Sequence, residues 1–131
     1  MYTQAILKQH YQEVPHTIQR AALMYVHILN KYHYENTLQY YLQHDPRDIY
    51  STIPNSILED NKNYLTCIDP DYPNKLFNLY NYPCALFYQG NKDLLRLPSI
   101  GIIGSRENDA YGERVIAELI RQLPKDIAII S

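Results

Sequence analysis

Two short apolar runs separated by an amphipathic segment constrain the fold of this chain more than any other feature. Residues 99–104 (SIGIIG) and 126–131 (DIAIIS) are nearly continuous apolar runs, a pattern typical of strands buried on both faces of a parallel sheet. The segment between them predicts a helix capped by Asn108 or Asp109 and ended by Pro124. Its apolar face comprises Val115, Ile116, Leu119, Ile120 and Leu123. Strand, helix and strand in this order predict one right-handed βαβ unit.

The second strand of this unit is the last element of the sequence. Two or three parallel strands cannot bury both of their faces, because a sheet of this kind needs neighbouring strands and covering helices. We therefore expect the chain to be the front part of a larger α/β protein, truncated in the middle of its sheet.

Residues 1 to about 60 predict a small helical bundle. Apolar periodicity indicates a first helix up to residue 14, a second starting at Pro15, a third ending near Asp45-Pro46 and a weaker fourth around residues 57–58. Residues 21–26 place apolar side chains on nearly every face of the second helix, so we expect this helix at the centre of the bundle. Its predicted seam toward a partner helix is Ile18, Ala22, Tyr25, Leu29 and Tyr32.

Residues 66–83 are rich in proline, asparagine and aspartate, which indicates an extended, turn-rich connecting segment. The predicted domains are therefore residues 1–65, the helical domain with the start of its linker, and residues 66–131, the α/β portion. Within the latter we expect a strand at 84–88 and a short helical turn at 91–97.

Composition excludes several classes of function. The net charge of −2 gives no general support for nucleic-acid binding, so any such site must be a local patch. There is no export signal and no apolar run of the length that a membrane span needs, so we expect a cytoplasmic protein without membrane contact. Cys67 and Cys84 are 17 positions apart and are expected to be free thiols.

The histidines and tyrosines have ordinary structural interpretations. All five histidines lie in the first 44 residues without metal-ligand spacing, so we expect no metal site and place them on helix surfaces. Fourteen tyrosines could stack on bases, but their helical spacing favours a role as amphipathic core residues.

The glycines indicate a binding turn. All four, Gly90, Gly101, Gly104 and Gly112, fall in one window of 23 residues, where we expect unusual backbone or close approach. Gly104, Ser105 and Arg106 follow a buried strand and precede a helix, the place where open α/β sheets bind ligands. Backbone amides, the Ser105 hydroxyl and the Arg106 guanidinium together suit a phosphate.

The alternatives at this turn remain open. The spacing matches neither a dinucleotide fingerprint nor a P-loop, and a plain turn with a solvated arginine accounts for the same residues. Glu107 and Asp109 add negative charge beside it, although Asp109 also suits a helix cap. The sequence shows no set of residues typical of catalysis. Ser105 has no histidine in its own domain to act as a base, and Asp69 and Asp71 are interpreted as turn residues.

The second half of the chain resembles the bacterial DNA processing protein A family, also called Smf. The matching residues are Asp71 to Leu76 (DYPNKL), Tyr82 to Asn91 (YPCALFYQGN), Leu94-Leu95, Ile100 to Arg106 (IGIIGSR) and Tyr111-Gly112. Several motifs in the family's order and with similar gaps make this resemblance more specific than the turn alone. It covers residues 68–131.

The resemblance implies a fold and a function. It implies an extended Rossmann-like domain preceded by a helical domain similar to the sterile-alpha-motif fold. It also implies single-stranded DNA binding, transfer of that DNA to the RecA recombinase in natural transformation, homodimerisation of the intact protein, and neither cofactor nor enzymatic activity. The family's phosphate contacts map onto Gly104, Ser105 and Arg106, with Gly101 and Gly112 as supporting backbone. The family's second phosphate loop follows the position of Ser131.

The expected fold class is therefore α + α/β, a helical bundle followed by the first βαβ part of a Rossmann-like sheet. Two other functions stay open. One is a nucleotide-phosphate binder similar to the lysine-decarboxylase-like phosphoribohydrolases, which need acidic catalytic residues not seen here. The other is an inactive truncated remnant in which only the helical bundle folds.

Overall fold

The computed structural model describes residues 4–131 of the chain. Its internal contacts divide it into two compact units, Met1–Gly90 and Asn91–Ser131, which are described separately below. The assignment of domains to residues 1–65 and 66–131 remains a prediction.

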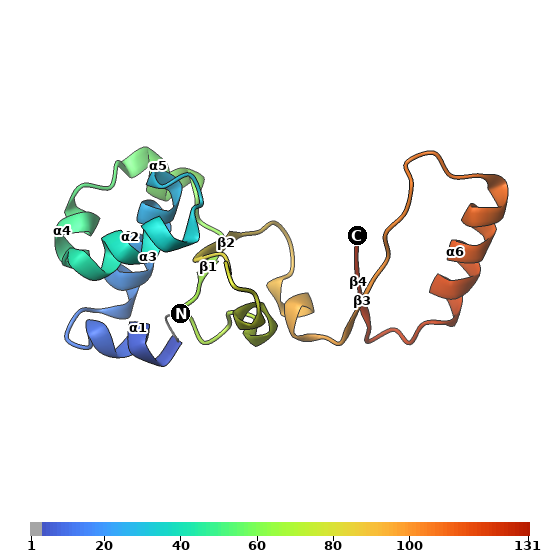
Figure 1. Cartoon of the computed structure of the whole chain (residues 1–131), viewed down its shortest axis with the longest axis horizontal. Helices are drawn as coiled ribbons and strands as arrows, with labels where there is room; N and C mark the ends of the chain where they lie inside the picture. The colour runs from blue at the N-terminus through green and yellow to red at the C-terminus, as the bar shows by residue number, and fades with distance from the viewer. Residues whose placement is uncertain (1–3) are drawn as a thin grey trace. The chain divides into compact units, whose positions relative to one another are not determined.

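Within residues 4–90, five α-helices and a pair of short strands form the first unit (Figure 1). The strands β1 and β2 are antiparallel, with Leu65 opposite Leu86 at the centre of the register. A 3₁₀ helix, η1, lies in the connection between them. The bounds are α1 (Gln4–His10), α2 (His16–Leu29), α3 (Tyr34–Gln43), α4 (Pro46–Ser51), α5 (Asn55–Asp60), β1 (Tyr64–Thr66), η1 (Asn74–Asn78) and β2 (Ala85–Phe87).

Helix α2 is the centre of this unit, as the sequence predicts. It packs against α3, α4, β1 and β2, and Leu23, Met24 and Val26 are fully buried. The predicted seam is wrong at its C-terminal end, where Leu29 is 56% exposed and Tyr32 is 62% exposed. The reason is that α2 ends at Leu29 and the chain then turns through two residues of positive φ, so Tyr32 lies outside the helix.

Helix α4 is absent from the sequence-based prediction. The pair Asp45-Pro46 is interpreted there as the end of the third helix, which does end at Gln43. In the structure the same pair also starts a new helix. The Asp45 side chain accepts a hydrogen bond from the Arg47 N–H at 2.8 Å, and Pro46 occupies the first turn, where no amide hydrogen is needed.

Residues 66–83 are not an exposed connecting segment. Ile68, Tyr72 and Tyr82 are at most 2% exposed and belong to the main hydrophobic core of the first unit. The Tyr72 hydroxyl donates to the Pro83 carbonyl oxygen at 2.7 Å, which ties the middle of the segment to its C-terminal end. Its prolines and asparagines do form turns, but the aromatic residues between them fill the core.

The placement of the histidines on helix surfaces is wrong for His27. Its side chain is 1% exposed, and Nδ1 lies 3.2 Å from the Thr37 hydroxyl oxygen. The core role expected for the tyrosines is confirmed for Tyr41 and Tyr82, which are fully buried, but not for Tyr80 and Tyr111, which are 68% exposed.

The second unit contains the predicted strand–helix–strand sequence. Its elements are η2 (Lys92–Arg96), β3 (Ser99–Gly101), α6 (Ala110–Gln122) and β4 (Ala128–Ile130). Strands β3 and β4 are parallel, with Ile100 opposite Ile129. Parallel pairing with a helix in the connection is the predicted βαβ order; the Rossmann-like continuation remains a prediction.

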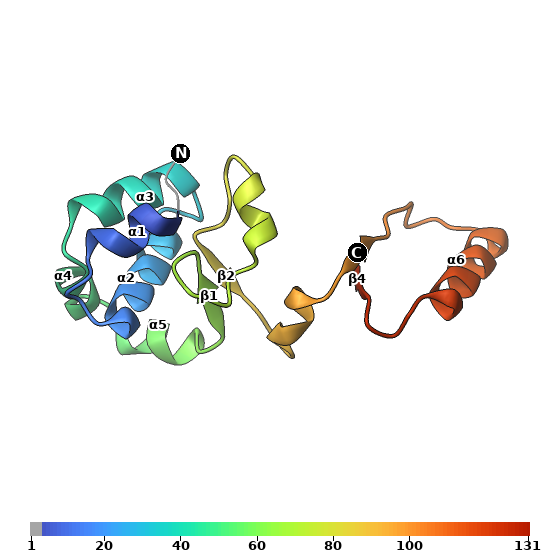
Figure 2. The same ribbon diagram turned by 90° about the horizontal axis from the view of Figure 1, so that it is seen from below.

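The predicted burial of these strands is wrong within this unit. Ile100 and Ile129 are 42% and 43% exposed, and no residue of α6 is buried. Figure 2, like Figure 1, shows α6 standing away from the β3–β4 pair. The apolar faces that the sequence assigns to a sheet core therefore stay accessible in the second unit.

Candidate functional site

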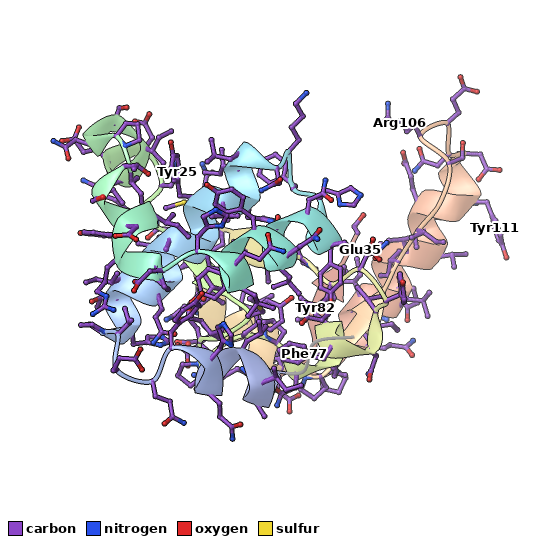
Figure 3. The ribbon with its side chains drawn as sticks, turned by 60° about the vertical axis from the view of Figure 1, so that its left-hand side comes forward. Tyr25, Glu35, Phe77, Tyr82, Arg106 and Tyr111 are labelled. Carbon is purple, nitrogen blue, oxygen red and sulfur yellow. The ribbon has the colours of Figure 1, made fainter. Side chains whose placement is uncertain are left out.

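The loop between β3 and α6 carries the predicted binding residues. The parallel pair ends where the Ile102 N–H donates to the Ile130 carbonyl oxygen at 2.8 Å, and the chain then leaves the sheet. Gly104, Ser105 and Arg106 are all exposed on this loop, and the Arg106 label of Figure 3 lies at its outer end. The structure thus brings the three residues to the carboxyl end of a strand, as expected.

The polar groups of this loop are largely unengaged. The Ser105 Oγ accepts a hydrogen bond from the Glu107 N–H at 3.1 Å, which leaves its own hydrogen available for donation. No acceptor among residues 4–131 engages the backbone N–H groups of Ser105 and Arg106, and no described carboxylate pairs with the Arg106 guanidinium. A turn with free amides, a hydroxyl and an unpaired guanidinium suits an anion with several oxygens.

The start of helix α6 is occupied by its own cap. The Asp109 carboxylate accepts a hydrogen bond from the Gly112 N–H at 2.7 Å. This carboxylate brings negative charge to the helix N-terminus, the position that a bound phosphate would otherwise favour. Anion binding here therefore depends on the turn at Gly104–Arg106 more than on the helix end.

The glycines differ in what they contribute. Gly90 alone has a positive φ, at +88°, so the expected unusual backbone is found there and not at the other three. A Cβ at Gly101 or Gly104 would meet no atom within 4 Å. A Cβ at Gly112 would lie 3.3 Å from Asp109 Oδ1, so the absence of a side chain there leaves room for the capping carboxylate. The roles of Gly101 and Gly112 in binding remain predictions.

Two exposed side chains near the turn escaped the sequence-based assignment of the site. Tyr111 lies in the first turn of α6 and is 68% exposed, and Figure 3 shows its side chain extended from the helix. Arg114 is exposed on the same helix. The sequence marks Tyr111 only as part of the Tyr-Gly motif, and exposure is the property that makes it a candidate for stacking on a base.

A second polar cluster lies in the first unit, around Asp69. Its carboxylate lies 2.6 Å from His16 Nε2 and 3.1 Å from Arg20 Nε, and it accepts the Thr66 N–H at 2.7 Å. The Arg20 guanidinium also donates to the Tyr64 carbonyl oxygen at 2.7 Å and lies over the Tyr64 ring. The turn role predicted for Asp69 is confirmed, but its basic partners on α2 were missed.

This cluster acts as a clamp between α2 and the turn after β1. Burial by itself raises the pKa of the Asp69 carboxyl. The Thr66 N–H and the Arg20 guanidinium outweigh that effect, so the pKa lies below its usual value. A carboxylate held ionised and fully hydrogen-bonded is suited to structural support rather than to proton transfer.

Comparison with protein families decides the assignment of the chain. Residues 63–131, just over half of it, match the model of the family described as DNA recombination-mediator protein A. The chain belongs to this family. The match includes β1, β2 and the whole second unit, so the turn at Gly104–Arg106 lies inside the family region, whereas His16 and Arg20 lie outside it.

Two curated relatives share this region. The chain is 36% identical over 64 residues to the DNA processing protein DprA of Streptococcus pneumoniae, which is 49% of this chain and 23% of that protein. It is 32% identical over 71 residues to the protein Smf of Synechocystis, which is 51% of this chain and 18% of that protein. The chain thus spans about a fifth of the length of these relatives. No solved structure matches it significantly.

The helices add one further observation. Over residues 4–131, none combines the length and the apolar character that crossing a membrane requires.

Proposed function

We propose that this member of the DNA recombination-mediator protein A family binds single-stranded DNA through the phosphate backbone, at the turn formed by Gly104, Ser105 and Arg106. The observation that carries the proposal is the exposed, unpaired Arg106 guanidinium beside the free amides of its own turn. Contacts to phosphate give affinity without base preference, because every nucleotide presents the same oxygens.

The charge around the turn sets the character of this binding. Arg106 provides one cation, whereas Glu107 and Asp109 lie close in sequence and are exposed. Attraction to a polyanion is then local and modest, so binding should be weak and, with one cation engaged, should fall only gradually as salt rises. Tyr111 is placed to add base stacking, which is also tolerant of sequence.

The description of the family as a DNA recombination mediator supports a wider role in recombination. We propose that the bound strand is passed to the RecA recombinase during natural transformation, in the cytoplasm, by a homodimer. In this proposed role the protein orders and delivers DNA without breaking or forming covalent bonds.

Fluorescence anisotropy with labelled oligo-dT at low salt tests the DNA contact. Arg106→Ala should weaken binding by about 1–3 kcal/mol, roughly 5- to 150-fold, the range for a hydrogen bond to a charged group. Arg121→Ala is the matched control, since it removes the same charge from α6, where Arg121 is paired with Glu118 at 2.8 Å. The control should bind like the unchanged chain.

The proposal fails if the Arg106 and Arg121 variants give the same curve, or if the unchanged chain does not bind at all. Competition with adenosine monophosphate separates the nucleotide-binding alternative. Adenosine monophosphate at a small molar excess over oligo-dT should leave the anisotropy of the labelled oligo-dT unchanged. If the mononucleotide displaces oligo-dT at a concentration equal to that of the protein, a pocket for a single nucleotide is favoured.

A further inference from the structure

Two cysteines that are distant in sequence are direct neighbours across the β1–β2 pair. The register places Tyr64, Leu65 and Thr66 opposite Phe87, Leu86 and Ala85. Continuing it by one residue places Cys67 opposite Cys84, and the Cys67 N–H donates to the Cys84 carbonyl oxygen at 3.0 Å. The sequence gives no sign of this contact, because it depends on how the strands pair.

The position in the ladder fixes the spacing of the two backbones. At the other end of the pair, the Tyr88 N–H donates to the Asn63 carbonyl oxygen at 3.1 Å. Hydrogen-bonded positions recur at every second residue, so Cys67 and Cys84 occupy such a position. Opposed Cα atoms there lie about 5.5 Å apart, within the range of about 4.4–6.8 Å that a disulfide spans. The Cβ atoms of such a pair usually lie about 4.5–5.5 Å apart, so forming the bond requires the two strands to draw slightly closer at this end.

Both side chains lie on the same face of the strand pair. Leu65, Cys67 and Cys84 belong to the main core of the first unit, whereas Tyr64 and Ala85 belong to a separate cluster on the other side. Both cysteines are 0% exposed and both are free thiols. The neighbouring Cys67 thiol and burial together raise the pKa of the Cys84 thiol, which donates to the Tyr34 carbonyl oxygen at 4.0 Å.

We propose that Cys67 and Cys84 form a reversible dithiol–disulfide site whose reaction partner is a small-molecule disulfide. One thiolate attacks a sulfur of the small disulfide, forms a mixed disulfide and releases one small thiol. The second cysteine then attacks the protein-bound sulfur, which forms the Cys67–Cys84 bond and releases the second small thiol. The two cysteines together lose two electrons and two protons, and the small disulfide is reduced by the same amount.

Because both thiols are buried, their oxidation should be slow. A reagent reaches the sulfurs only when the end of the strand pair opens, so the reduced form should persist through brief exposure to an oxidant. Once formed, the bond closes a ring that contains Asp69, η1 and Tyr82. It thereby holds the turn of the Asp69 clamp and the packed segment after it against the core.

The test uses the unchanged chain with oxidised glutathione. Prolonged incubation should give a monomer that has lost two hydrogen atoms in mass and carries no glutathione, with the peptides of Cys67 and Cys84 joined in a non-reduced digest. The unfolding temperature of the first unit should rise by about 10 °C, because the ring formed by the disulfide restricts the unfolded chain. Reduction with dithiothreitol should reverse this rise.

Cys67→Ala and Cys84→Ala are matched controls, since each leaves one thiol and should give only a mixed disulfide without the rise in unfolding temperature. If these variants fail to fold, the unchanged chain still decides the matter. Glutathione retained on the cysteines, dimers linked between chains, or thiols that stay unmodified while the same chain in urea is oxidised would each overturn the proposal.

Discussion

Protonation of His27 should control the stability of the first unit between pH 7 and pH 5. The Thr37 hydroxyl donates to the His33 carbonyl oxygen at 2.6 Å, so its oxygen accepts from His27, and Nδ1 carries the hydrogen of the neutral ring. The Tyr32 ring packs against the His27 ring, and their centroids lie 5.5 Å apart. A positive charge on this 1% exposed side chain loses its hydration, and burial lowers the His27 pKa to about 4.

The sign and size of the effect follow from linkage. The unfolded chain binds a proton at a pKa of about 6.5, whereas the folded chain does not until about pH 4. Between these values the unfolded state holds more protons, so acid favours unfolding. The stability is complete above pH 6.5 and is lost as the pH falls toward 4, by about 3 kcal/mol in total and by about 2 kcal/mol between pH 7 and pH 5.

Urea unfolding followed by circular dichroism measures this loss directly. His27→Gln should flatten the dependence between pH 7 and pH 5, because its amide does not titrate. His10→Gln is the control, since His10 is exposed on α1 and its replacement should leave the slope in place. The range avoids Asp69, whose lowered pKa places its own contribution at more acidic pH. Parallel slopes for the His27 variant and the unchanged chain would refute the reasoning.

Three further predictions concern single residues. Asp69→Asn should lower the free energy of unfolding of the first unit by about 2 kcal/mol, since it removes charged hydrogen bonds to Arg20 and Thr66, and an unchanged urea midpoint would contradict this. Gly90→Ala should lower the free energy of unfolding by about 1 kcal/mol because φ at this position is +88°. Gly90→Asn should lower it less when measured by the same urea unfolding. Asp109→Asn keeps a cap but removes a charge, so it should tighten oligo-dT binding severalfold at low salt, and weaker binding would argue against the turn.

Local signals account for the parts of the fold that the sequence predicts. Apolar periodicity places α2 and α6, and the Asp109 cap marks the start of α6 within one residue. The same kind of signal exists at Asp45-Pro46, where an aspartate followed by proline starts α4, but a proline is also a common helix end. Such pairs are resolved only by what the following residues pack against.

Contacts between distant residues account for most of what the sequence missed. Asp69 meets Arg20 across 49 positions of sequence. Residues 66–83 resemble a linker because prolines and asparagines mark turns, and only the packed structure shows that Tyr72 and Tyr82 fill the core. For the candidate site, the sequence predicts the position of Gly104–Arg106, but the exposure of Tyr111 depends on how α6 is oriented.

The exposed apolar face of α6 would couple the proposed DNA binding to any partner that packs on that face. With no buried side chain, α6 gains little free energy from packing within the second unit, so we expect an equilibrium between an ordered and a less ordered form. If DNA binds at the turn as proposed and requires the ordered form, the observed affinity is the intrinsic affinity multiplied by the ordered fraction. A surface that packs on Val115 and Leu119 should therefore strengthen DNA binding without touching a phosphate. By reciprocity, DNA should strengthen the binding of that surface by the same factor.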